Sequence, residues 1–270
     1  MQLKNLIKLF KFRTNLGYDP LLNLSRKNLG FYARSRFFLQ KFTLGSCTML
    51  LLQFSTSHYC RKARLALGYK QIPYEVENLT PGLHLVRVKP LTGLTTLPVL
   101  LPQQAGLPGA IGDSTQIFKF LESYQPAPPL FLPTPEHQME AAMLEDWLDE
   151  SIGTATRFVY YHFRAGAGKQ IDPSFSSQAV IQVVRWQYGI NDAAVQLAVS
   201  RLTTAIDVLC QRWSKSPYLV GNQLSIADLA AGALLSPLAL IPAYRQDYPW
   251  LFERIIDIHH QCRTPLPPGL

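Results

Sequence analysis

Cysteine is scarce in this sequence of 270 residues, which contains four cysteines at wide intervals. That spacing excludes the dense framework of a small disulfide-stapled domain, and it favours a reducing compartment. We therefore expect no disulfide bond and a cytoplasmic location.

Long apolar runs are missing as well. The longest stretches, such as residues 229–241, fall short of the ~20 residues that a helix needs to cross a bilayer. Gly232, Ser236 and Pro237 also interrupt this stretch. We expect no integral membrane association.

Acidic residues are almost absent from the first part of the chain. Residues 1–48 hold nine of the 26 Lys and Arg residues but one of the 18 Asp and Glu residues, so the remainder has 17 of each kind. The formal net charge of +8 therefore belongs to this basic extension. Because the remainder is neutral, we expect no nucleic-acid partner.

The extension, residues 1–48, permits three readings. An apolar stripe with helical period runs through residues 3–10, with lysines on the other faces, as in a membrane-surface helix or an organelle transit peptide. The third reading is a disordered tail or an upstream-start artefact, with Met49 as the real start one residue before the first expected strand.

Apolar residues make up 47% of the chain and aromatic residues 11%, enough for a sizeable core. Residues 49–125 alternate short apolar runs with one amphipathic segment after the first run and another at the end. In the first segment, Cys60 and Ala63 share the apolar face, and Arg61, Lys62 and Arg64 are expected to face outward. The order β-α-β followed by β-β-α is thioredoxin-like. The expected strands are residues 50–54, 72–76, 99–101 and 110–112, and the expected helices are residues 58–68 and 115–124.

Residues 126–135 are rich in proline, which cannot continue a helix, so they are expected to be a linker. Beyond them the apolar residues recur with helical period. We expect an all-α domain over residues 136–262 and a tail over residues 263–270. The predicted fold class is therefore an α/β thioredoxin-like N-terminal domain followed by an all-α C-terminal domain.

Ser57 occupies the corner between the first expected strand and its helix. Free backbone N–H groups and the positive end of the helix favour an anion there, and the hydroxyl can donate to a thiolate. Lowering the pKa of a thiol by two units needs ~2.7 kcal/mol. A hydrogen bond to a charged acceptor supplies ~1.5 to 3 kcal/mol and a helix end ~0.3 to 1 kcal/mol. The alternative reading is a plain N-cap serine.

Cys60 follows Ser57 at the spacing of a redox Cys-x-x-Cys pair, but the first cysteine of such a pair is replaced by Ser57. Its place on the apolar helix face predicts a buried packing residue. Thiol transfer by Cys60, with a small thiol as co-substrate, stays open as an alternative reading.

These segments together resemble the glutathione S-transferase superfamily, on its serine-type, bacterial-like branch. The resemblance rests on S-x-x-C-R at 57–61, L-P-V-L at 97–100, G-D-S at 112–114 and L-V-G-N-Q-L-S-I-A-D at 219–228, in this order. It covers about residues 49–258 and implies a homodimer that needs no cofactor, with glutathione as co-substrate.

The resemblance also implies site residues. Ser57 is the catalytic residue that holds the thiolate. Leu97 and Pro98, joined by a cis peptide bond, bind the cysteinyl part of glutathione. Asp113 and Ser114 hold its γ-glutamyl end. The family more often has valine before the proline and Glu-Ser at the second position, so Leu97 and Asp113 are departures.

Other candidate residues carry weaker signals. Tyr59, Tyr160 and Phe163 are expected to line an apolar substrate pocket, since the resemblance places residues 160–163 against the cleft. Asp228 belongs to a capping box that begins at Ser225, so it is predicted to be structural. His259, His260 and Cys262 lack a fourth metal ligand nearby and are expected to form a polar C-terminal face, so no metal site is predicted.

The sequence thus predicts an enzyme of detoxification that conjugates glutathione to a small apolar electrophile. The competing hypothesis is a non-catalytic member of the same fold that binds a partner or an apolar ligand.

Overall fold

The computed structural model describes residues 49–270, so the predictions on residues 1–48 lie outside the described residues. Its first part contains a four-stranded sheet of order β2-β1-β3-β4. Strand β1 pairs parallel with β2 and antiparallel with β3, which pairs antiparallel with β4. The strands are β1 (Met49–Gln53), β2 (Glu75–Asn78), β3 (Val99–Pro102) and β4 (Ile111–Gly112).

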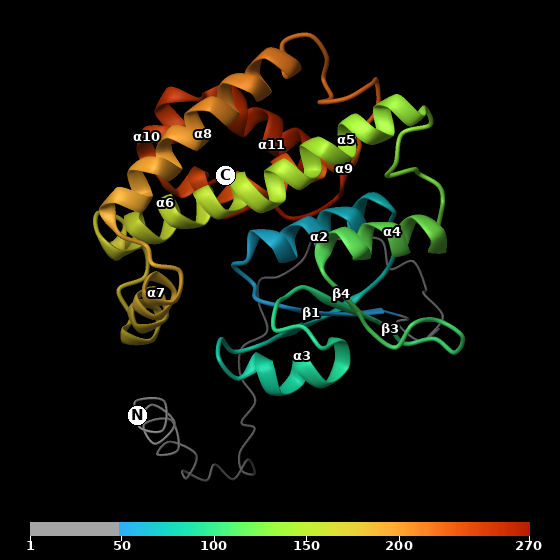
Figure 1. Cartoon of the computed structure of the whole chain (residues 1–270), viewed down its shortest axis with the longest axis horizontal. Coiled ribbons are helices and arrows are strands. Elements are labelled where there is room, and N and C mark those ends of the chain that lie inside the picture. The colour runs from blue at the N-terminus through green and yellow to red at the C-terminus, as the bar shows by residue number, and fades with distance from the viewer. Residues whose placement is uncertain (1–48) are drawn as a thin grey trace, which may run out of the picture. The chain divides into compact units, whose positions relative to one another are not determined.

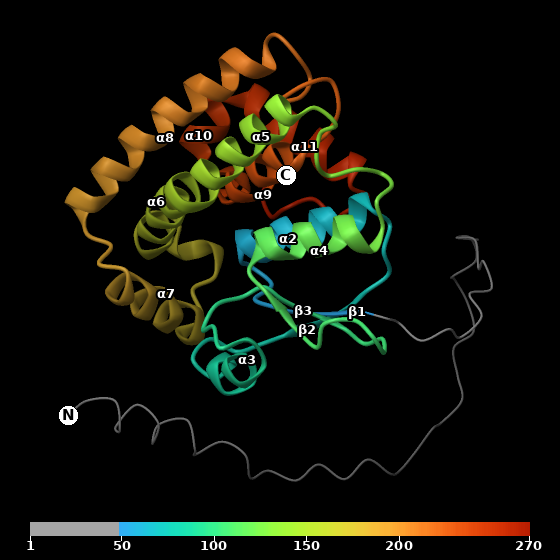
Figure 2. The same ribbon diagram turned by 45° about the vertical axis from the view of Figure 1, so that its right-hand side comes forward.

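Three helices cover this sheet. Helices α2 (His58–Tyr69) and α4 (Ser114–Tyr124) lie over one face, and α3 (His84–Thr92) lies over the other (Figures 1 and 2). A small core of Leu52, Val88, Val99 and Leu101 fills the space between the sheet and α3. The thioredoxin-like prediction is confirmed, although β2 begins three residues later than expected and α3 was not expected.

The second part is entirely helical within the described residues, as predicted. It begins after the proline-rich segment, and a π-helix, η1, continues α5 directly into α6. The elements are α5 (Pro135–Trp147), η1 (Leu148–Ile152), α6 (Gly153–Ala165), η2 (Lys169–Ile171), α7 (Phe175–Gln187), α8 (Asp192–Trp213), α9 (Ile226–Leu234), η3 (Ser236–Leu240), α10 (Pro242–Asp247) and α11 (Pro249–Gln261).

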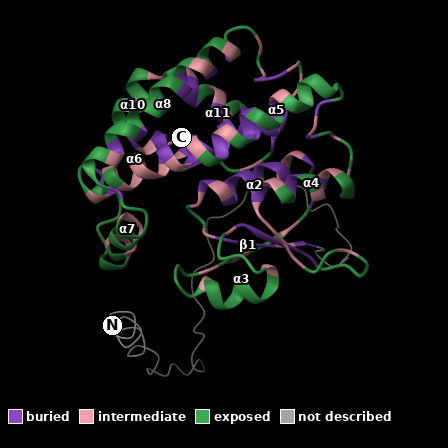
Figure 3. Ribbon diagram, in the orientation of Figure 1, coloured by how far each residue is buried: buried purple, intermediate pink, exposed green. Residues whose placement is uncertain are grey.

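Helix α9 forms the centre of the helical part, with all nine of its residues buried (Figure 3). It packs against α2, α5 and α11, so one hydrophobic core is continuous from the sheet to the helices. The capping box at its start is present, as predicted, with the carboxylate of Asp228 accepting from the backbone N–H of Ser225. Because Asp228 also accepts from Leu219 N at 2.8 Å, its role is structural.

Helix α8 is long and apolar enough to cross a membrane by length and composition alone. It packs against α6, and Val195, Ala198, Leu202 and Leu209 contribute to the main core. The core helix of a globular protein passes the same test of length and composition, so α8 is weak evidence for a membrane span.

The surface of α2 corrects one expectation. Lys62 is fully buried and Arg61 is 8% exposed, although both were expected to face outward. The reason is that α2 is covered by the helical part on one side and by the C-terminal residues on another, so only Arg64 among the three is half-buried. His259 and Cys262 are likewise buried, so they do not form the expected polar face.

Candidate functional site

The register of the sheet brings three chain segments to one edge. Val99 pairs with Leu52 of β1 on one side and with Gly112 of β4 on the other. The chain leaving β1, the chain entering β3 and the chain leaving β4 therefore meet at the same edge. Their residues are those that the sequence predicted for a glutathione site: Ser57, Leu97, Pro98, Asp113 and Ser114.

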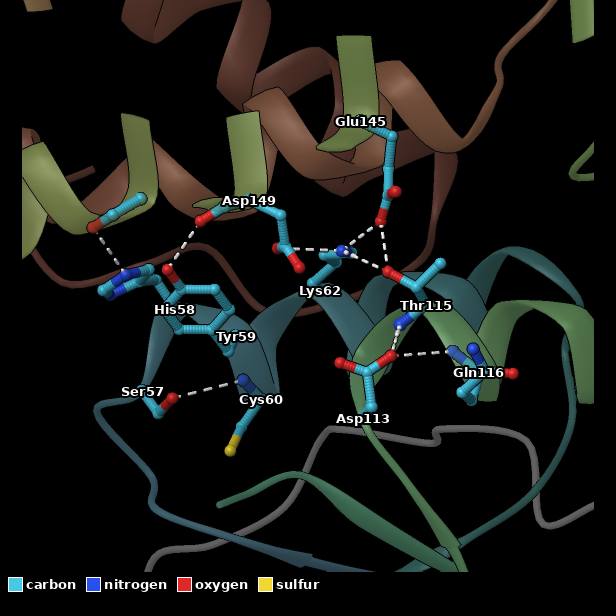
Figure 4. Close-up of polar contacts among 11 residues, drawn as sticks. Ser57, His58, Tyr59, Cys60, Lys62, Asp113, Thr115, Gln116, Glu145 and Asp149 are labelled. Atoms are coloured by element: carbon cyan, nitrogen blue, oxygen red, sulfur yellow. Dashed lines mark hydrogen bonds and ion pairs between the residues drawn. The ribbon is translucent and has the colours of Figure 1, made fainter. Parts of the chain in front are cut away.

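Two helices begin at this edge of the sheet. Ser57 is the N-cap of α2, and Asp113 is the N-cap of α4 (Figure 4). The first N–H groups of a helix lack partners inside the helix, and the helix dipole places positive charge there. Two such ends at one edge favour a ligand that carries negative charge.

The hydroxyl of Ser57 accepts a hydrogen bond from the backbone N–H of Cys60 at 3.3 Å. Ser57 is therefore an N-cap, as its alternative reading required. The hydroxyl also lies close enough to the Cys60 thiol to favour its thiolate, but burial has the larger effect and raises the pKa of Cys60. Because Cys60 is fully buried and protonated at neutral pH, it is poorly suited to act as a nucleophile.

Asp113 has φ of 72°, in the left-handed region that is uncommon for residues other than glycine. One carboxylate oxygen accepts from the backbone N–H groups of Thr115 and Gln116, both at 3.0 Å. The other oxygen takes no part in the contacts drawn in Figure 4. The cap thus fixes Asp113 at the N-terminus of α4 and leaves its second carboxylate oxygen for another partner.

The peptide bond between Leu97 and Pro98 is cis, as the resemblance implies. Pro98 is buried and Leu97 is half-buried, packed against the small core under the sheet. Leu97 lies two residues before the start of β3, in the chain that enters the sheet at this edge.

Tyr59 joins this edge to the helical part. Its hydroxyl donates to the carbonyl of Asp149 at 2.7 Å. The π-helix η1, called the π-turn below, leaves that carbonyl available. Its Gly153 N–H bonds to the carbonyl of Leu148, whereas in an α-helix it would bond to that of Asp149. Tyr59 was predicted to line a substrate pocket, and this contact favours a role in joining the two parts of the protein.

His58 makes a parallel contact with the same turn, through Nε2 and the Gly153 carbonyl at 3.1 Å. The carbonyl can only accept, so Nε2 carries the proton. Burial, followed by the charge of Arg157, lowers the pKa of His58 to about 3. The imidazole is therefore neutral in the folded protein at neutral pH.

This lowered pKa predicts a pH dependence of stability. In the unfolded chain His58 titrates near its ordinary value of 6.5, so the contribution from keeping it neutral is present above that pH and is lost as the pH falls toward about 3. At pH 4.5 the wild type should lose about 2–3 kcal/mol relative to His58→Gln, whose amide keeps a donor for the Gly153 carbonyl. Urea unfolding of both proteins at pH 7 and 4.5 measures the difference.

The matched control is His137→Gln, at an exposed position on α5. Burial raises the pKa of Asp149 and of Asp228 to about 6, and a raised carboxyl pKa makes stability increase as the pH falls, opposite to the effect of His58. The measured quantity is therefore the difference in unfolding free energy between the wild type and the variant, in which these carboxyl contributions cancel. An equal response of the His58 and His137 variants to pH would contradict the prediction.

Lys62 forms the centre of a buried polar cluster between the starts of α2 and α4 and the helical part (Figure 4). Its ammonium pairs with the carboxylate of Glu145 and with Asp149 Oδ1 at 2.8 Å. Thr115 Oγ1, two residues after Asp113, donates to Glu145 at 2.7 Å. The cluster thereby ties the starts of α2 and α4 to α5 and the π-turn.

Two residues predicted for the substrate pocket lie on α6. The hydroxyl of Tyr160 accepts from Arg164 at 3.0 Å. Phe163 lies so close to Gly168 that any side chain there would collide with its ring. Both are half-buried, and Phe163 packs against the main core. Their role in a substrate pocket stays a prediction.

No sequence pattern identified Arg157 or the cluster around Lys62. The guanidinium of Arg157 lies over the ring of Tyr59 at 5.2 Å and over that of Tyr188 at 4.5 Å. A spacing pattern alone does not reveal such contacts. The one available signal was the pair Glu145 and Asp149, whose i, i+4 spacing on an otherwise apolar helix face indicates buried carboxylates that need a cation.

Comparison with known proteins agrees with this geometry. A model of the family described as glutathione S-transferase, N-terminal domain, matches residues 51–129. A second, described as glutathione S-transferase, C-terminal domain, matches residues 192–253. A search of curated proteins finds no match.

Many solved structures share the fold, at low sequence identity. A glutathione S-transferase from Xanthobacter autotrophicus is 17% identical, with a TM-score of 0.63 over 82% of this chain and 97% of that one. One from Methylobacterium radiotolerans, in complex with glutathione sulfonate, is 22% identical, with a TM-score of 0.61 over 81% and 94%. One from Methylobacillus flagellatus, with glutathione bound, is 20% identical, with a TM-score of 0.57 over 80% and 99%. With both domain families matched in order and the fold shared, the chain belongs to the glutathione S-transferase superfamily.

Proposed function

We propose that the protein binds glutathione at the edge formed by Ser57, Leu97–Pro98 and Asp113–Ser114, and transfers it to small apolar electrophiles. The observation that carries the proposal is the strand register Leu52–Val99–Gly112, which brings these three segments together. Two of the similar structures contain glutathione or its sulfonate, which supports the choice of ligand.

In this proposal Ser57 holds the sulfur of glutathione. The thiol loses its proton to solvent, and the Ser57 hydroxyl donates a hydrogen bond to the resulting thiolate at the positive end of α2. The thiolate then uses its electron pair to form a C–S bond with the electrophile, and the leaving group departs with the electrons of the broken bond. Catalysis comes from lowering the pKa of the thiol and from proximity.

The remaining contacts hold the peptide. The backbone of Leu97 is placed to pair with the cysteinyl residue as an added strand. The free carboxylate oxygen of Asp113 suits the ammonium group of the γ-glutamyl end, and the N–H groups at the start of α4 suit its carboxylate. This chemistry requires no metal or organic cofactor.

The second candidate is a non-catalytic binding module of the same fold. The Ser57 cap is the observation that favours it, because a cap alone accounts for a serine at this corner. A cytoplasmic location, a homodimeric state and a role in detoxification stay predictions, and size-exclusion chromatography with light scattering tests the homodimer.

The test of the proposed function uses the full chain. Glutathione titrated into the protein should give a saturable binding signal, and a generic aryl halide should be converted to its glutathione conjugate. Binding without turnover of any electrophile in a chemically varied panel would favour the binding module. Absence of glutathione binding would contradict the enzyme and leave the module that binds a partner or an apolar ligand.

Cys60→Ala distinguishes conjugation from thiol transfer. Because Cys60 is buried and its thiol is protonated, the variant should keep most of its conjugation activity and lose about 1 kcal/mol of stability, the cost of removing one small buried group. Conjugation and disulfide reduction by glutathione are measured side by side. If activity vanished while glutathione still bound, thiol transfer by Cys60 would replace the proposal.

A further inference from the structure

A cavity of about 280 Å³ lies between α2 and the C-terminal residues. None of the residues of the proposed glutathione site lines it. Its polar residues come from the chain around α2 and from α11, and its apolar residues come mostly from the last residues of the chain. The lining is Ser55, Arg61, Arg64, Leu65, Tyr74, His259, Thr264, Pro265, Leu266 and Pro268.

The cavity contains two cations and no counter-ion from the described residues. Arg61 is 8% exposed, and neither Arg61 nor Arg64 forms an ion pair with any carboxylate of residues 49–270. Arg64 donates to Gln53, whereas the buried Nε of Arg61 has no hydrogen-bond partner within these residues. Buried charges are ordinarily paired. Arg164 on α6 is also buried without an ion pair, but it donates to Tyr160 and does not line this cavity, whereas Arg61 does.

His259 adds a second unsatisfied atom to the same cavity. Its Nδ1 donates to the Ile255 carbonyl at 2.8 Å, and its buried Nε2 has no partner among the described residues. Burial lowers the pKa of His259 to about 4, with Arg61 and Arg64 contributing in the same direction. With the proton on Nδ1, Nε2 is an acceptor and must take up a proton before it can donate to an anion. A negative charge in the cavity would offset both arginines and favour that protonation.

We propose that this cavity is a second binding site, which takes a small organic anion with one carboxylate or phosphate group on an apolar body. The planar guanidinium groups of Arg61 and Arg64 match either oxyanion through paired N–H donors. Leu65 and Pro265 supply an apolar wall for the body. Because ligand pockets span roughly 300–1,000 Å³, a cavity of about 280 Å³ suits a small ligand of this kind.

The site is separate from the glutathione site. Arg61 and Arg64 lie on a different face of α2 from Lys62, and none of Ser57, Leu97, Pro98, Asp113 or Ser114 lines the cavity. The C-terminal residues that close it are held in place, because the Cα of Gly68 faces the Cys262 carbonyl and Gly269 lies against Ala239. Occupancy should therefore be independent of glutathione.

Calorimetric titration of the full chain tests the proposal with phenyl phosphate, benzoate and neutral benzyl alcohol. At least one of the two anions should bind with one ligand per chain, equally well with and without saturating glutathione, and benzyl alcohol should not bind. The comparison of phenyl phosphate with benzoate identifies the preferred oxyanion.

Arg61→Gln should weaken anion binding by about 10- to 100-fold, the loss expected for a charge-assisted contact. The matched control Arg201→Gln, at an exposed position of α8, should bind as the wild type does. The melting temperature of ligand-free Arg61→Gln should be unchanged or higher, since the variant removes an unpaired buried charge. If Arg61 had a purely structural role, its replacement would instead lower the melting temperature.

Three results would overturn the proposal: no binding of either anion, undiminished binding by Arg61→Gln, or displacement of the anion by glutathione. The titration without glutathione tests this site even if the proposed function fails. If Arg61→Gln does not fold, Arg64→Gln gives the same comparison at a half-buried position.

Discussion

Replacing Lys62 with methionine is expected to lower the free energy of unfolding by about 3–5 kcal/mol, the cost of leaving buried charge without its partner. Lys62 is fully buried, and its two carboxylate partners, Glu145 and Asp149, are 4% and 6% exposed. Methionine fills a similar volume, so the loss comes from the two carboxylates that would stay buried without a cation.

The loss should depend on pH. Burial already raises the pKa of Asp149 to about 6, with Lys62 acting against this rise. Without Lys62 the pKa of Asp149 rises further, and a raised carboxyl pKa means stability that is present at low pH and is lost as the pH increases. The deficit of Lys62→Met should therefore be smaller at pH 5 than at pH 8.

Chemical unfolding of wild type and Lys62→Met at pH 5 and 8 measures both effects. Lys119→Met, at an exposed position of α4, controls for loss of a positive charge. Adding Glu145→Gln to Lys62→Met should recover part of the stability, since it removes one unpaired charge and keeps an oxygen for Thr115. A deficit under about 1 kcal/mol, the range of exposed pairs, would contradict the prediction.

The order of elements in the thioredoxin-like part could be predicted because each element has a local signal. Short apolar runs mark β1 and β3, and the amphipathic pattern after Ser57 marks α2. Helix α3 lacks such a signal, because it contains Pro90 and only Val88 among its residues is buried. Because a single residue of α3 is buried, the sequence of this helix shows almost no apolar periodicity.

Burial of the charged residues on α2 could not be predicted for a different reason. Lysine and arginine side chains are mostly exposed in proteins. Lys62 is buried because it bonds to Glu145 of α5, which lies 83 residues away in the sequence. Only the packing of α2 against the helical part reveals that Lys62 lies inside and that Arg61 borders a cavity.

The candidate glutathione site was predictable to the extent that its residues adjoin strand ends. Pro98 and Asp113 each adjoin a strand, and Ser57 follows β1 by four residues, so sheet pairing brings the three segments to one edge. A substrate pocket has no such rule. Tyr59, Tyr160 and Phe163 were predicted from residue type and helix position. The contacts of Tyr59 and Phe163 depend on the π-turn and on the turn at Gly168, and no local sequence pattern predicted either turn.

Ser57→Ala is expected to reduce conjugation at neutral pH by roughly one to two orders of magnitude, since it removes a charge-assisted hydrogen bond worth ~1.5 to 3 kcal/mol. Glutathione binding should weaken less, because Leu97, Asp113 and Ser114 keep their contacts in the proposed complex. The pKa of the bound thiol should rise toward its free value, so raising the pH should restore part of the rate.

The variant also removes an N-cap, and a matched control separates the two effects. Ser174 caps α7 by accepting from Ser177 N at 3.3 Å, the same distance as at Ser57. Ser174→Ala should therefore cost a similar ~1 kcal/mol of stability without loss of turnover. Ser57→Thr keeps a hydroxyl and should retain more activity than Ser57→Ala.

Thiolate absorbance of bound glutathione, titrated against pH for the wild type, Ser57→Ala and Ser174→Ala, measures the proposed effect directly. A lowered thiol pKa in the wild type and in Ser174→Ala, but not in Ser57→Ala, would establish that the Ser57 hydroxyl holds the sulfur. If the wild type and Ser57→Ala gave identical titrations, Ser57 would be only the cap of α2. Since the fold positions the same residue for either role, that result would favour the binding module over the enzyme.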